Sequence, residues 1–240
     1  MEEKSLKTKL QVFISYYKWY ILIALFFVAV LGIMLVQMIN KEEYDITVMY
    51  AGNAIFGDKQ SADIENAVAG LGDEGEKALL YELVIMNDDE LKKAYESGLS
   101  SNGLNNSTIR KNRENLATNV MSDQYFILLL SPECYATMQG NGTLENICEL
   151  GVDTSGAVMH SEYAIKLKSL AFVKRYTAFS VLPDDTLLCF KRISEFGAAK
   201  KDKQEKRTHD IEIFRRMVEY KVGYSGAAQT LFVPDKREEL

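Results

Sequence analysis

Residues 19–40 read WYILIALFFVAVLGIMLVQMIN and contain no charged side chain. A helix rises about 1.5 Å per residue, so a segment of this length spans roughly 33 Å, the thickness of a bilayer core. Aromatic rings favour the headgroup region of a membrane. Four of them gather at the N-terminal edge of the segment: Tyr16, Tyr17, Trp19 and Tyr20. The segment predicts a transmembrane helix that contacts the lipid bilayer through residues 19–40.

A cleaved signal peptide is the alternative interpretation of the same segment. The apolar run is longer than a typical signal core, and no small-residue cleavage site follows it. The next residues, Lys41, Glu42 and Glu43, are unsuited to cleavage. We therefore expect a permanent anchor.

The charges on either side of the anchor differ in sign. Residues 1–18 hold four lysines and two glutamates. The whole chain carries −6, so residues 41–240 carry −8. Positive flanks stay in the cytoplasm, which predicts a cytoplasmic N-terminus and an extracellular C-terminal domain in the cell membrane. An acidic domain also argues against a nucleic-acid partner.

Beyond the anchor, strand patterns alternate with helix patterns. Residues 44–50 (YDITVMY) alternate apolar and polar, whereas residues 77–86 (KALLYELVIM) and 125–130 (YFILLL) are almost wholly apolar. Helices are expected after each strand, the third beginning at Ser131-Pro132 with proline in the first turn. We expect a loop at residues 97–108 and a helix at residues 109–121.

The second half of the domain is less regular. Residues 163–168 could be strand or helix, and residues 170–179 fit a short helix. A strand is expected at residues 187–192 (LLCFKR) and a last helix at residues 208–220. The basic run at residues 198–209 is interpreted as a solvated linker.

Together these patterns predict an α/β fold. One transmembrane helix is followed by a three-layer α/β domain with a mostly parallel sheet. The expected divisions are a cytoplasmic tail at 1–18, the transmembrane helix at 19–40, the domain at 41–222 and a C-terminal tail at 223–240. Ligands of such sheets bind beyond the carboxyl ends of the strands.

Four residues therefore become candidate ligand-binding positions: Tyr50, Asn53, Asn87 and Ser131. Tyr50 could stack on a ligand, and the others could form hydrogen bonds with it. The alternative is that the polar ones are helix caps or turn residues and that Tyr50 belongs to the core.

One part of the sequence resembles a known family. Ser122-Asp123, the strand YFILLL and the segment SPECYATMQGNGTLENI at residues 131–147 resemble the type 2 periplasmic solute-binding proteins. Gly142-Thr143-Leu144 resembles a segment that follows a ligand-cleft helix in that family. The opening YDITVMYAG at residues 44–52 is similar too, and LPDDTLLCFKR at residues 182–192 resembles uncharacterised bacterial membrane-anchored relatives.

The resemblance covers residues 44–150 and implies a solute-binding-like fold. Two lobes closing over a ligand need more residues than follow the anchor, so the resemblance implies one lobe and part of another.

Motifs for catalysis and cofactors are missing from the sequence. It has no P-loop, GxGxxG, G-x-S-x-G or zinc spacing, so we expect a non-catalytic protein without cofactor or metal. His160 with Asp153 and Glu162 matches no metal motif. Cys134 and Cys148 are near enough in sequence to form a disulfide, although core cysteines are commoner.

The functional expectation is a membrane-anchored extracytoplasmic binding or interaction module of unknown ligand. The alternative is a structural accessory subunit that holds a membrane or envelope protein partner. A deep polar cleft at Gly52, Asn53 and Ser131 would favour solute binding, whereas an exposed apolar patch would favour a protein partner.

Overall fold

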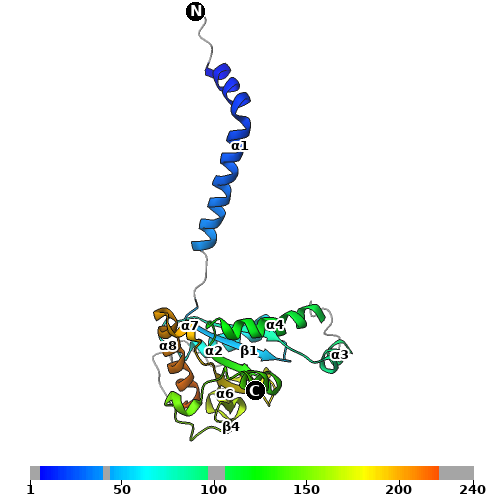
Figure 1. Ribbon diagram of the computed structural model, residues 1–240, viewed down its shortest axis with the longest axis vertical. Coiled ribbons are helices and arrows are strands. Elements are labelled where there is room, and N and C mark those ends of the chain that lie inside the picture. Colours follow the sequence, from blue (N-terminus) through cyan, green and yellow to red (C-terminus); the bar gives the residue numbers. More distant parts are fainter. Residues whose placement is uncertain (1–5, 40–43, 97–105, 222–240) are drawn as a thin grey trace, which may run out of the picture. The chain divides into compact units, whose positions relative to one another are not determined.

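The computed structural model describes residues 6–39, 44–96 and 106–221. It divides into two compact units, Met1–Glu43 and Tyr44–Leu240. The expected C-terminal tail at 223–240 and most of the loop expected at 97–108 lie outside the described residues. Figure 1 shows the helix of the first unit and the α/β arrangement of the second.

The first unit contains one long helix, α1 (Leu6–Ile39). Its segment Tyr16–Met34 has a mean hydropathy of 2.0, and none of it is buried against protein. The helix is thus long and apolar enough to cross a membrane, which confirms the expected N-terminal helix at this level. It begins at Leu6, inside the expected tail at 1–18, because leucine and lysine are good helix formers.

Six strands form one mixed sheet in the second unit, in the order β2-β1-β3-β6-β5-β4. Parallel pairing joins β1 to β2 and to β3, whereas β3–β6, β6–β5 and β5–β4 are antiparallel. Four strands thus point one way, and β4 and β6 point the other. The strands are β1 (Ile46–Gly52), β2 (Ala78–Val84), β3 (Ile127–Leu130), β4 (Met159–Ser161), β5 (Ala164–Lys166) and β6 (Leu187–Phe190).

The α/β class is confirmed. The expectation of a mostly parallel sheet is confirmed in part: four of the six strands run in the same direction, but only two of the five neighbouring pairs are parallel. The antiparallel half went unforeseen because β4 and β5 have three residues each, too few to show a pattern.

Seven α-helices are described in the second unit: α2 (Asp58–Ala69), α3 (Asp88–Glu96), α4 (Asn106–Met121), α5 (Pro132–Gly140), α6 (Ala171–Arg175), α7 (Glu195–Ala198) and α8 (Lys201–Val218). Three 3-10 helices add short turns: η2 (Ile147–Leu150), η3 (Leu167–Ser169) and η4 (Thr177–Val181).

The expectation of a solvated linker at residues 198–209 is wrong, because α8 begins at Lys201. Lysine, glutamine and glutamate are strong helix formers. An exposed pair between Lys201 and Glu205, 3.2 Å apart, also fits the i,i+4 spacing of a helix.

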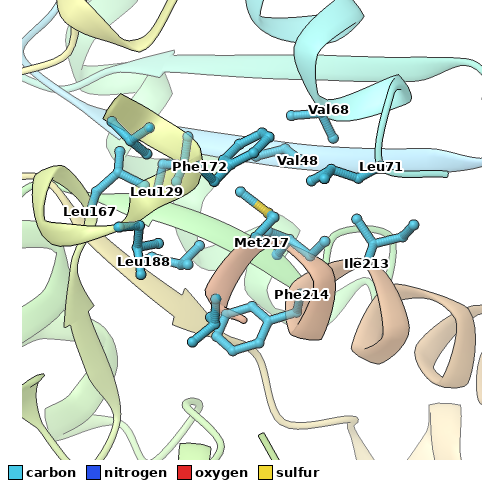
Figure 2. Packing of buried hydrophobic residues seen from close by; sticks show 14 of the residues in the cluster. Val48, Val68, Leu71, Leu129, Leu167, Phe172, Leu188, Ile213, Phe214 and Met217 are labelled. Atoms are coloured by element: carbon cyan, nitrogen blue, oxygen red, sulfur yellow. The ribbon is translucent and has the colours of Figure 1, made fainter. Parts of the chain in front are cut away.

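Helices cover both faces of the sheet, because neighbouring side chains on each strand point to opposite faces. On β1, Val48 packs into one core with α2, α6 and α8, and Met49 packs into the other with α4 and α5. Figure 2 shows the first core, where Phe214 and Met217 of α8 lie among the side chains of the sheet and of α6. The three-layer arrangement is therefore present.

The strand order reverses at β1, with β2 on one side and β3 on the other. In α/β sheets such a reversal marks the place where ligands bind, beyond the carboxyl ends of the strands. We call this the carboxyl end of the sheet; the opposite end, where β1, β2 and β3 begin, is the amino end.

Candidate functional site

The reversal point is filled by a side chain of the protein. Tyr50 is fully buried, and its hydroxyl accepts a hydrogen bond from the Ala54 amide at 2.9 Å. Its ring lies edge-on to Phe56, with the ring centres 4.9 Å apart. Burial raises the pKa of Tyr50 to about 12. Tyr50 thus belongs to the core beneath the carboxyl end and does not offer its ring to the surface.

Gly52 completes this packing. A Cβ atom there would lie 2.5 Å from the Tyr50 hydroxyl and 3.2 Å from the Ser131 Cβ. The Ser131 amide also donates to the Ala51 carbonyl at 2.9 Å, which joins the ends of β1 and β3. The crevice expected between these strands is therefore closed by Tyr50, Gly52 and Ser131.

Asn53 and Asn87 are both exposed and are connected through Glu90. The Asn53 side-chain amide donates to Glu90 Oε1 at 2.8 Å. Glu90 Oε2 accepts from the Asn87 amide, and Asn87 Oδ1 accepts from the Glu90 amide, both at 2.9 Å. This reciprocal pair is the capping box of α3. One glutamate therefore ties the loop after β1 to the start of α3.

Ser131 caps α5. Its hydroxyl accepts from the Cys134 amide at 3.4 Å, and Pro132 occupies the first turn. Cys134 is buried, and burial raises the pKa of its thiol. Cys134 and Cys148 are both free cysteines, Cys148 being exposed.

The structure thus places all four candidate residues at the carboxyl end and gives each a structural role. Glu90 was missed by sequence reasoning, although Asn87 followed three residues later by Glu90 is the sequence signature of a capping box.

Acidic side chains surround this group. The exposed ones are Asp88, Asp89, Glu133, Asp184 and Asp185. Asp185 and Glu90 both act electrostatically to raise the pKa of Tyr50, which places their charges near the reversal point. The surface at the carboxyl end is therefore polar and acidic.

A second charged group lies buried at the amino end. The Lys191 ammonium donates to Asp123, whose carboxylate also accepts from the Ser194 hydroxyl and from the Ser194 amide at 3.1 Å. Both charged side chains are almost fully buried. Burial alone would raise the pKa of Asp123, but the hydrogen bonds from Lys191 and Ser194 hold it below its usual value.

This group has the composition of a serine–lysine site, but not its chemistry. A lysine that is ion-paired to a carboxylate has no free lone pair to accept a proton from Ser194. Ser194 also caps α7, since its hydroxyl accepts from the Gly197 amide at 3.0 Å. The group therefore fastens α7 to the start of β3.

Among the described residues, no three His, Cys, Asp or Glu side chains gather in a way that could hold a metal ion. His160 instead lies edge-on to Tyr135, with ring centres 5.2 Å apart. No family model, curated protein or solved structure matches this chain.

Proposed function

We propose that this protein is a membrane-anchored interaction module that binds a protein partner at the carboxyl end of its sheet. The apolar helix α1 supports the anchor. The excess of lysine before that helix supports a cytoplasmic N-terminus and an extracytoplasmic second unit. The proposed role is non-catalytic: to hold another protein at the membrane.

The filled reversal point carries this proposal. Tyr50 occupies the position where a small ligand would enter, so recognition is left to the surface groups above it. Asn53 and Asn87 present exposed amides, and the carboxylates around them are exposed as well. This surface is polar and acidic and differs from the exposed apolar patch expected of a protein partner, so the proposal rests on the filled reversal point and on the surface charge. The charge favours a partner segment rich in lysine or arginine.

Site-specific photocrosslinking in native membranes tests the proposal. A photoreactive amino acid replaces Asn53 in the full-length protein, and in a matched control it replaces Asn66, an exposed asparagine on α2. A discrete crosslinked protein from position 53 and none from position 66 is the expected result. Equal crosslinking from both positions, or none from position 53, would contradict the proposal.

A second candidate is binding of a small solute at the same place. The exposed side-chain amides of Asn53 and Asn87 favour it, because both lie at the carboxyl end of the sheet and could form hydrogen bonds with a polar solute. Thermal unfolding of the full-length protein with sugars, peptides, amino acids and metal ions tests this candidate. A ligand at 100 times its dissociation constant adds about 2.7 kcal/mol of stability. The absence of any shift would leave the protein-partner proposal in place.

A further inference from the structure

Phe196 is the most exposed large apolar side chain among the described residues of the second unit, with 88% of its surface accessible. It lies on α7, which the Ser194 cap fastens to the buried Asp123. The neighbouring Gly197 is buried, and a Cβ there would meet the Asp123 carboxyl group. The helix therefore has a fixed orientation, with Gly197 inward and Phe196 outward.

α7 lies at the amino end of the sheet. β6 is antiparallel to β3, so it ends at Phe190 opposite Ile127, where β3 begins. The Lys206 ammonium of α8 donates to the Asp45 carbonyl at 3.4 Å, just before β1. Figure 1 shows α7 and the start of α8 at the amino end of the sheet, where β1 begins.

The chain also joins the anchor to the second unit at this end. Only residues 40–43 separate the end of α1 from Tyr44, and β1 begins two residues later. The sequence therefore joins α1 to the amino end of the second unit through residues 40–43.

The segment from α7 to the start of α8 has a local excess of basic side chains. Exposed Asp45, Asp73 and Glu74 also lie at this end of the sheet, so the basic excess belongs to this segment alone. Residues 195–207 contain five basic and three acidic side chains, on a domain of net −8. Lys200 and Lys201 are exposed, next to α7. The pair that Lys201 forms with Glu205 is exposed, and exposed pairs exchange readily with other partners.

We propose that α7 and the first turn of α8 form a membrane-contact surface for a bilayer with anionic headgroups. Phe196 enters the headgroup region, where amphipathic and aromatic side chains are favoured, while Lys200 and Lys201 lie beside lipid phosphates. This inference rests on the proposed anchor. It makes the amino end the membrane-facing end of the second unit and leaves the carboxyl end accessible to a partner.

Tryptophan fluorescence in lipid nanodiscs tests the surface. Trp19 is the single tryptophan of the chain, so Trp19→Phe gives a silent full-length background. Phe196→Trp then reports on α7, and Val158→Trp is the matched control. Val158 is 52% exposed, and its carbonyl accepts from Lys166, which pairs with Leu187 at the carboxyl end. The nanodiscs contain phosphatidylglycerol and phosphatidylcholine, a fraction of the latter brominated.

The expected result is a blue-shifted emission at position 196 that brominated lipid quenches several-fold more than the emission at position 158. Adding Lys200→Glu and Lys201→Glu should reduce that quenching. Equal quenching at the two positions in nanodisc-bound protein would overturn the contact surface and leave the anchor intact. Quenching at position 196 that is the same with and without Lys200→Glu and Lys201→Glu would overturn the role of the lysines. Protein that does not remain with nanodiscs in gel filtration would overturn the anchor and this inference together.

Discussion

Lys191 at the end of β6 is ion-paired in the protein interior with Asp123, a residue 68 positions earlier in the chain. Its ammonium also lies 5.4 Å from the centre of the Phe126 ring. Asp123 adopts a left-handed backbone conformation, with φ of 48°. The pair connects the turn before β3 to the segment that leads into α7, and it holds α7 in place.

Removing one partner of this pair should destabilise the protein strongly. Lys191→Met leaves the Asp123 charge buried without its cation, and such losses cost about 3–5 kcal/mol. Urea unfolding followed by circular dichroism measures the effect. Lys168→Met is the control, because Lys168 pairs at 3.2 Å with Asp184, which is 97% exposed, and should change stability by less than about 1 kcal/mol. Similar losses from both changes would refute the distinction.

Because Tyr50 closes the reversal point, adding a single methyl group at Gly52 should lower the free energy of unfolding substantially. Gly52→Ala forces a methyl group against the Tyr50 hydroxyl and should destabilise the protein by about 1–3 kcal/mol. Gly140→Ala is the control, since no atom lies within 4 Å of that Cβ and the residue is the last of α5. Thermal melting of both variants compares them. A Gly52→Ala protein as stable as the Gly140→Ala protein would show that the space is open.

His209 should make stability depend on pH near neutrality. Asp210, 3.7 Å from its Nδ1, and Glu76, 2.9 Å from its Nε2, raise the pKa of His209 above its usual value. Lys206, 3.3 Å from Asp210, shares the same carboxylate. Because the folded state binds the proton more tightly, this stabilisation is complete below about pH 6.5 and is lost as the pH rises through the folded pKa.

Urea titrations of the wild type and of His209→Gln across this pH range measure that contribution. The unfolding free energy of the wild type should fall toward higher pH more steeply than that of the variant. If the unfolding free energies of the wild type and of the variant change with pH in the same way, the two carboxylates do not raise the pKa of His209.

The exposed Cys148 allows the proposed orientation to be tested without adding a label site. Cys134 and Cys189 are buried, and burial raises the pKa of the Cys189 thiol, so both should react slowly. A membrane-impermeant maleimide applied to intact cells should label the wild type and leave Cys148→Ser unlabelled. Labelling that requires broken cells would place the second unit in the cytoplasm.

The sequence indicated the parallel half of the fold well, because β1 alternates apolar and polar residues, β2 and β3 are almost wholly apolar, and each precedes a clear helix signal. It indicated the positions of Ser131 and Asn87 too, since Ser131 directly follows β3 and Asn87 lies three residues after the end of β2. What the pattern could not show is how side chains pack in space: that Tyr50 fills the crevice, or that Glu90 connects Asn53 to Asn87. The burial of Lys191 could not be predicted from the sequence either. A lysine at a strand end normally lies in solvent, and only the tertiary contact with Asp123 makes its burial energetically tolerable.

The position of β1 also has a mechanical consequence. This strand is the one attached to the anchor, yet it is hydrogen-bonded on both sides, to β2 and to β3. A pull between the proposed anchor and a proposed partner held at Asn87 or Ser131, which follow β2 and β3, would load both ladders in shear along the strand direction. Many hydrogen bonds would then have to break together, and resistance would be set by the unfolding rate. The fold is therefore suited to bearing tension.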